Sequence, residues 1–166
     1  MKTIRTPALI LGLLYLIFLG CLVWSSPRLP AHLATHFDGN GRATGWMGSS
    51  AYLQSMIVFG LVFPLFVPAI SYLSRFFPQC CNIPNRDYWF APARRGEVFD
   101  YLFRHSLWLG CMALCFVIGV HFSTIHANSL GQPHLSTLLV LALAGCFLVG
   151  TAIWTLSMFR HFNHVA

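Results

Sequence analysis

Charged residues are scarce in this chain. Only 8% of its 166 residues are Asp, Glu, Lys or Arg, and just four of them are acidic. Hydrophobic residues make up 57% of the sequence, and the mean hydropathy is +0.67. A soluble domain of this size could not cover its surface with so few polar groups. The composition therefore excludes a soluble fold and predicts an integral membrane protein.

Ionisable residues are also missing from the middle of the long apolar runs. A driven transporter keeps acidic or basic groups at mid-membrane depth, because a charge there is costly and persists chiefly where function needs it. In the third run the histidines lie near the ends, at His105, His121 and His126. This pattern argues against a driven transporter.

Paired metal-ligand spacings are absent as well. The six cysteines include no C-x-x-C pair and no paired Cys/His spacing. Cys80 and Cys81 are adjacent, on the side of the membrane that we expect to be cytoplasmic, where disulfides are rare. We expect neither a structural zinc site nor a disulfide framework, and no cofactor.

Four apolar runs are present, each long enough to cross a hydrocarbon core of roughly 30 Å. The fold expected is all-α and integral to the membrane, a single polytopic domain over residues 1–166. Its helices are predicted at about 7–24, 52–77, 106–124 and 135–159, with an outer loop at 25–51 and an inner loop at 78–105. Pro64 and Pro68 predict a kink in the second helix.

The basic residues predict the orientation. Eight of the ten fall on one side of the four runs, namely Lys2, Arg5, Arg75, Arg86, Arg94, Arg95, Arg104 and Arg160. Only Arg28 and Arg42 fall on the other side. The positive-inside rule then gives cytoplasmic N- and C-termini, and it accounts for the net charge of +6 without nucleic acid. No A-x-A cleavage site follows the first run, so we expect it to be retained as a helix rather than removed as a signal peptide.

Within the outer loop, residues 29–50 allow two interpretations. His32 and His36 are four apart and on a helical turn could share one metal ion, with Asp38 as a third ligand. Leu33 stands where a zinc-protease motif needs its glutamate, so that hydrolase is excluded. Alternatively the loop is structural: Trp46 anchors it at the headgroup level, glycines make the turn, and His36 bonds to loop backbone.

The inner loop combines aromatic and basic residues. Residues 88–90 form an interfacial aromatic cluster, and Ala93–His105 has the spacing of an amphipathic helix leading into the third span. Arg94 and Arg95 lie on that segment. They either bind anionic lipid headgroups or serve only as topology signals.

Together the two loops resemble a bacterial membrane family called domain of unknown function 1648, a module also found in SdpI-type toxin-immunity proteins. The similarity spans Leu14–Tyr101. The matching residues are Pro30, His36, Phe37, Gly41 and Trp46 in the outer motif, and Asn85, Asp87, Tyr88, Trp89, Ala91, Pro92, Arg94 and Arg95 in the inner motif. The chain departs from the family where Ala34 and Thr35 replace an Ile-Pro pair.

This resemblance implies a multi-pass helical protein of the bacterial inner (cytoplasmic) membrane, without an agreed activity. We take His36, Phe37, Trp46, Asp87, Tyr88, Trp89, Arg94 and Arg95 as candidate binding residues, and no residue as catalytic.

The function expected is that of a non-enzymatic sensor, immunity or accessory component. The alternative is a membrane-embedded enzyme or small transporter that uses His32, His36 and Asp38. Expected partners are the lipid bilayer, anionic lipids, and another membrane protein or a second copy of the chain. A stripe of small residues at Ala142, Cys146 and Gly150 would let a helix approach closely.

Overall fold

Four long helices form the protein. The computed structural model describes residues 2–164, with side chains from Ile4 onward, so the side chain of the topology signal Lys2 lies outside the described residues. The helices are α1 (Lys2–Ser25), α2 (Ser49–Leu73), α4 (Arg95–Ser129) and α5 (Thr137–Asn163). All four are long and apolar enough to cross a membrane, so the chain is a multi-pass membrane protein. The expected helical membrane fold is confirmed.

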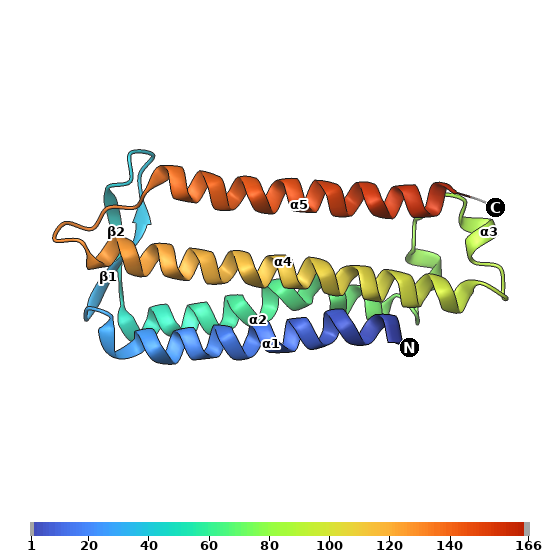
Figure 1. The fold of residues 1–166 in the computed structure, drawn as a ribbon, viewed down its shortest axis with the longest axis horizontal. Helices are drawn as coiled ribbons and strands as arrows, with labels where there is room; N and C mark the ends of the chain where they lie inside the picture. Colours follow the sequence, from blue (N-terminus) through green and yellow to red (C-terminus); the bar gives the residue numbers. More distant parts are fainter. Residues whose placement is uncertain (1, 165–166) are drawn as a thin grey trace.

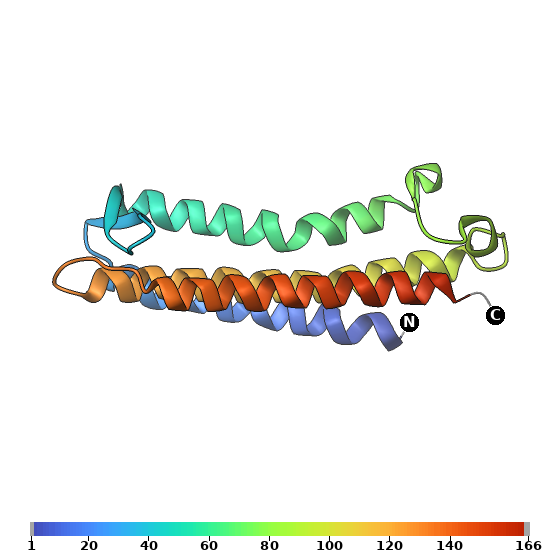
Figure 2. The same cartoon turned by 90° about the horizontal axis from the view of Figure 1, so that it is seen from above.

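The helices run roughly parallel to one long axis, with both termini at the same end (Figure 1). We call this the terminal end; it also carries the short helix α3 (Arg86–Trp89) and the 3-10 turn η2 (Pro78–Cys80). The opposite end, the hairpin end, carries two strands and the α4–α5 connection (Figures 1 and 2). Which end faces the cytoplasm stays a prediction.

The outer loop differs from expectation. It folds into an antiparallel hairpin of β1 (His32–Phe37) and β2 (Ala43–Gly48), preceded by the 3-10 turn η1 (Ser26–Arg28). Ala34 pairs with Trp46 and His36 pairs with Gly45, so the register shifts around Thr35. An acidic and glycine-rich turn between two short segments of β-branched and aromatic residues is a hairpin signal. The prediction that glycines form a turn in the outer loop is therefore correct only at the hairpin tip, because the residues on either side are strands.

The amphipathic segment predicted at Ala93–His105 is helical, but it is not a separate element. It is continuous with the third span, so that α4 runs for 35 residues from Arg95. The turn at residues 92–94, which begins with Pro92, precedes the start of α4, and no proline interrupts the helix afterwards. In α2 the helix is continuous through Pro64 and Pro68, and the predicted kink stays a prediction.

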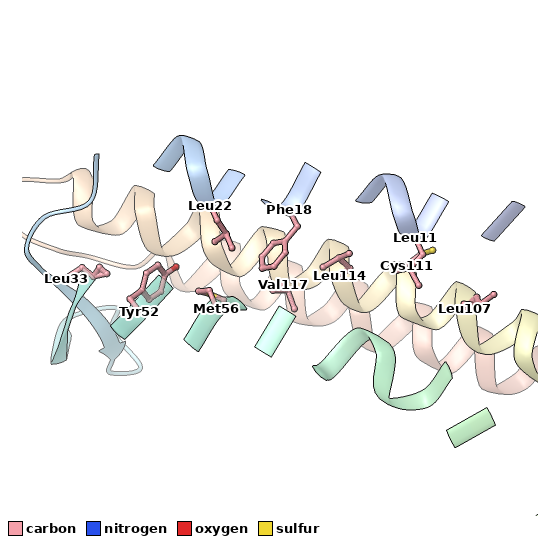
Figure 3. Packing of buried hydrophobic residues seen from close by; sticks show 10 residues of the cluster. All are labelled: Leu11, Phe18, Leu22, Leu33, Tyr52, Met56, Leu107, Cys111, Leu114 and Val117. Carbon is pink, nitrogen blue, oxygen red and sulfur yellow. The ribbon is translucent and has the colours of Figure 1, made fainter. Parts of the chain in front are cut away.

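α4 is the centre of the bundle. Its buried Leu114 and Val117 pack with Phe18 of α1 and Met56 of α2 (Figure 3). Two close approaches need glycine. A Cβ on Gly60 would lie 2.4 Å from the Phe18 ring, and one on Gly110 would lie 2.8 Å from the carbonyl oxygen of Pro64.

α5 is peripheral, and among its described residues only Phe162 is buried. Phe147 stacks on Phe116 of α4, with ring centroids 5.1 Å apart. Gly150 of the small-residue stripe lies against Met112 of α4, because a Cβ there would be 3.0 Å from the Met112 sulfur. At this position the stripe packs inside the protomer.

Candidate functional site

The hairpin tip is built around Asp38. Its Oδ1 accepts hydrogen bonds from the backbone N–H groups of Asn40 and Arg42, both at 2.9 Å. Gly41 has a φ of +81°, and a Cβ there would lie 2.1 Å from the carbonyl oxygen of Leu135, so only glycine fits. Asp38 therefore holds the turn.

His32 and His36 do not lie on a helical turn, so the arrangement on which the metal interpretation rested is wrong. Both belong to β1, where four residues span about 13 Å at strand rise. The Nδ1 of His36 lies 3.2 Å from Thr35 Oγ1. Within residues 2–164, no three His, Cys, Asp or Glu side chains lie close enough to hold one metal ion.

Trp46 and His36 project from the hairpin. The Trp46 side chain is 56% exposed, and His36 and His32 are also exposed. Phe37, in contrast, lines a small cavity of about 160 Å³ between the hairpin, α4 and α5. The three outer residues singled out from the sequence thus divide into two that face outward and one that faces the bundle.

The hairpin is fastened to α4 by Asn128. The Asn128 amide accepts from the backbone N–H of Ala34 at 2.7 Å and donates to the Ala34 carbonyl at 2.9 Å. The same Nδ2 donates to the Thr124 carbonyl at 2.9 Å. Ala34 is fully buried, so these bonds satisfy strand groups that water cannot reach. The tip is held separately, where Leu135 N–H donates to the Gly41 carbonyl at 2.8 Å.

A buried polar cluster lies just beneath the hairpin. His121 of α4 is fully buried, with Nδ1 2.9 Å from the Tyr52 hydroxyl and Nε2 3.0 Å from Ser25 Oγ. Ser25 donates to the carbonyl of Leu22 at 3.1 Å. One proton arrangement satisfies all three side chains: Tyr52 donates to Nδ1, and the Nε2–H donates to Ser25. The cluster ties α1, α2 and α4 together.

At the terminal end, the inner loop caps α5. Asn85 has a φ of 52°, in the left-handed region, and its Nδ2 donates to the Phe162 carbonyl at 3.0 Å. The indole N–H of Trp89 donates to the same carbonyl at 2.9 Å. These bonds satisfy a helix C-terminus that would otherwise have free carbonyl groups. Trp89 therefore has a structural partner in α5.

Aromatic and histidine rings continue from this cap into a stacked column. Trp89 stacks on His161, with centroids 5.3 Å apart, and His161 stacks on Tyr101 at 3.7 Å. Tyr101 stacks on His105 at 5.3 Å, and His105 on Trp154 at 4.7 Å. The column joins the inner loop, α4 and α5.

The two arginines singled out from the inner motif have different surroundings. The guanidinium of Arg94 lies 4.0 Å from the ring centroid of Tyr88, a cation–π contact, and Arg94 is half-buried. Arg95 is exposed and, with Asp87, lines a cleft of about 390 Å³. Of the five candidate residues of the inner loop, Asp87 and Arg95 thus line this cleft.

The predicted binding residues form two groups at opposite ends of the bundle. His36, Phe37 and Trp46 lie at the hairpin end, and Asp87, Tyr88, Trp89, Arg94 and Arg95 lie at the terminal end. Sequence reasoning missed the polar side chains that hold these groups in place, namely Ser25, Tyr52, His121, Asn128 and His161. The available signal was a histidine, His121, inside the third apolar run and an asparagine, Asn128, just after it.

A family described as Domain of unknown function (DUF1648) matches residues 13–70. The matched segment starts inside α1, includes the whole hairpin and ends inside α2. It contains His36, Phe37 and Trp46, and it stops before the inner motif at Asn85. No curated protein and no solved structure matches the chain. The first two long helices and the hairpin between them are therefore similar to this family of unknown function.

Proposed function

We propose that the protein is a non-enzymatic sensor or accessory component of a bacterial inner membrane. In this proposal the hairpin end faces outward and binds a partner, and the terminal end faces the cytoplasm. The distribution of basic residues supports the orientation, because eight of the ten lie at the terminal end. The match of residues 13–70 to the DUF1648 family, together with the resemblance of the loop motifs to the SdpI-type module, supports a role in immunity or as an accessory component.

The observation that carries the proposal is the fastening of the hairpin to α4. Asn128 bonds the buried strand backbone to the outer part of this helix, and His121 bonds the same helix to α1 and α2. At 1.5 Å per residue, the 35 residues of α4 reach roughly 50 Å, to the inner loop. A conformational change at the hairpin could therefore be transmitted to the inner loop through one helix, α4.

The exposed surface of the hairpin suits protein recognition. Trp46 is a large aromatic side chain that is 56% exposed on a strand whose backbone is fixed. Exposed aromatic residues on rigid elements are the usual anchors of protein interfaces. His36 lies on the neighbouring strand, paired with Gly45, and adds hydrogen-bonding groups to the hairpin end.

Co-purification tests this proposal. The tagged chain is extracted in mild detergent from the cells that express it naturally, and bound proteins are quantified by mass spectrometry. We expect His36→Ala combined with Trp46→Ala to lose most of a stoichiometric partner. His126→Ala, an exposed histidine of α4 outside the hairpin, should retain it. Equal recovery with both variants, or no stoichiometric partner of the unaltered chain, would contradict the proposal.

A second measurement separates binding from transmission. Hydrogen exchange of the inner loop, residues 82–94, is compared with and without the recovered partner. In the unaltered chain, we expect binding of the partner to change the exchange rate of this loop. In the Asn128→Ala variant, we expect the partner to bind without changing that rate. Identical responses in the two proteins would show that the Asn128 contact does not couple the ends.

A further inference from the structure

Two hollows lie side by side at the terminal end, and they differ in chemistry. The first is an apolar groove of about 530 Å³ between the last turns of α2, the first third of α4 and the last third of α5. Its walls include Ile70, Phe77, Leu102, Trp154 and Met158. These helix ends belong to segments that are long and apolar enough to span a membrane, so we expect acyl chains to meet the protein at this groove.

The second hollow is the cleft of about 390 Å³, lined by Arg86, Asp87, Phe90 and Arg95. The Arg86 guanidinium donates to the carbonyls of Cys81 and Pro78, at 3.3 and 3.5 Å. Neither arginine of the cleft has a carboxylate within ion-pair distance among residues 2–164, where the single ion pair joins Arg75 to Asp100. The Asp87 carboxylate also lines the cleft without forming an ion pair to either arginine, so two guanidinium groups and one carboxylate leave the lining with a net positive charge.

The turn η2 separates the two hollows. Pro78 and Gln79 face the cleft, while the next residues, Cys80 and Cys81, face the groove. A molecule that combines an anionic group with an apolar chain could thus place its anionic group in the cleft and its chain in the groove, on the two sides of one short turn. The groove wall also holds the Ser71 hydroxyl, which is buried without a described hydrogen-bond partner.

We propose that this composite site binds one anionic phospholipid. Arg86 and Arg95 hold the phosphate, and the groove between α2, α4 and α5 holds an acyl chain. Arginine forks match phosphate oxygens in geometry and charge. Arg94 is not part of the site, because it does not line the cleft and its guanidinium lies over Tyr88. The lipid would cover the flank of α5, which packs only loosely on the bundle.

A second groove of the same bundle provides an internal comparison. It has about 480 Å³ and is lined by residues of α1, α4 and α5, including Leu14, Trp108 and Phe147, with no charged residue among them. Ordinary boundary lipid would fill both grooves without preference for headgroup. A specific site predicts selectivity for anionic lipid at the first groove alone.

Fluorescence quenching by brominated lipid tests this selectivity. The protein is placed in nanodiscs of equal parts phosphatidylglycerol and phosphatidylcholine, with the acyl chains of only one lipid brominated. The signals of Trp154 and Trp108 are obtained as differences from Trp154→Phe and Trp108→Phe. We expect brominated phosphatidylglycerol to quench Trp154 more strongly than brominated phosphatidylcholine does, and to show no such preference at Trp108.

Charge removal then tests the cleft. Arg86→Gln with Arg95→Gln should reduce the preference at Trp154 by about fivefold for each arginine. Arg5→Gln with Arg160→Gln is the matched control, since it removes the same charge from exposed positions at the same end. Ser71→Phe should fill the groove and reduce quenching of Trp154 by both lipids. Circular dichroism confirms that each variant is folded.

Equal quenching of Trp154 by the two lipids would overturn the proposal and leave ordinary boundary lipid. The proposal would also be overturned if both double variants reduced the lipid preference at Trp154 equally, because the selectivity would then come from general surface charge. The result does not depend on the orientation of the protein, because both leaflets of the nanodisc have one composition. It is also independent of the partner that we propose for the hairpin.

Discussion

Two side chains of α4, the half-buried Asn128 and the buried His121, hold the hairpin end together. Each satisfies polar groups from other elements, and each lies on the same side of α4, seven residues apart. In an apolar environment an unpaired polar group costs more than a hydrogen bond contributes. Their removal should therefore be more harmful than the number of bonds alone indicates.

Asn128→Ala should destabilise the protein by about 2–3 kcal/mol, because the buried N–H and C=O of Ala34 lose their partners. The measurement is the free energy of unfolding in mixed micelles. Asn40→Ala is the matched control, since the side chain of Asn40 lies exposed at the hairpin tip. If the two variants were equally stable, the Asn128 contact would have no energetic importance.

Tyr52 and His121 should be energetically coupled. Tyr52→Phe removes one hydrogen bond and should cost about 1 kcal/mol, and His121→Phe should cost more because the hydrogen bond to Ser25 is lost as well. In a double-mutant cycle the two changes should be non-additive by about 0.5–1.5 kcal/mol. Tyr15→Phe paired with His121→Phe serves as a control cycle, because the Tyr15 hydroxyl donates instead to Gly60. Additive effects in both cycles would contradict the hydrogen-bonded cluster.

Among the elements, α4 organises the bundle and its glycines set how closely neighbours pack. Gly110 lies against the backbone of α2 at Pro64, where no side chain can move aside. Gly145 of α5 has open space around it, since a Cβ there would meet nothing within 4 Å. The two glycines therefore offer the same substitution in opposite surroundings.

Gly110→Ala should destabilise the protein by about 1–3 kcal/mol, because the added methyl group forces α2 and α4 apart. Gly145→Ala should be neutral or stabilising by up to about 1 kcal/mol, as expected for alanine in a helix interior. Thermal unfolding in detergent, followed by circular dichroism, measures both. A stable Gly110→Ala variant would show that α2 and α4 are not in the contact described.

The helices were predictable from the sequence, whereas their polar contacts were not. A bilayer fixes the length of an apolar run, so the four spans could be located from composition alone. The β-hairpin was missed because the i, i+4 spacing of His32 and His36 was interpreted as helical, although Gly39, Gly41 and Gly45 mark turns and strand irregularity. Spacing alone does not decide between the two structures.

The binding role of the candidate residues stays a prediction, and the sequence indicated their structural surroundings only in part. His36, Trp46 and Arg95 are exposed, as binding residues must be. Trp89, however, donates to the Phe162 carbonyl, 73 positions further along the chain. Such a contact depends on the tertiary arrangement of the helices, which no local pattern specifies. Asn128 was overlooked because a polar residue at the end of an apolar run resembles a turn residue.

At the scale of the whole molecule, two chemically different ends are joined by helices that cross a membrane. The hairpin end presents Trp46 and histidines on a fixed platform, and the terminal end presents the arginine-lined cleft and the groove. The proposals for partner binding and for lipid binding concern separate ends. Both require that the two ends lie on opposite sides of the bilayer.

Cysteine labelling with a membrane-impermeant maleimide tests that requirement most directly. In a background with the native cysteines replaced by serine, Asn40→Cys marks the hairpin tip and Glu97→Cys marks the start of α4. We expect intact bacterial cells with a permeabilised outer membrane to label Asn40→Cys at once, and to label Glu97→Cys only after the inner membrane is opened. Labelling of both positions in intact cells, or of neither, would contradict the account.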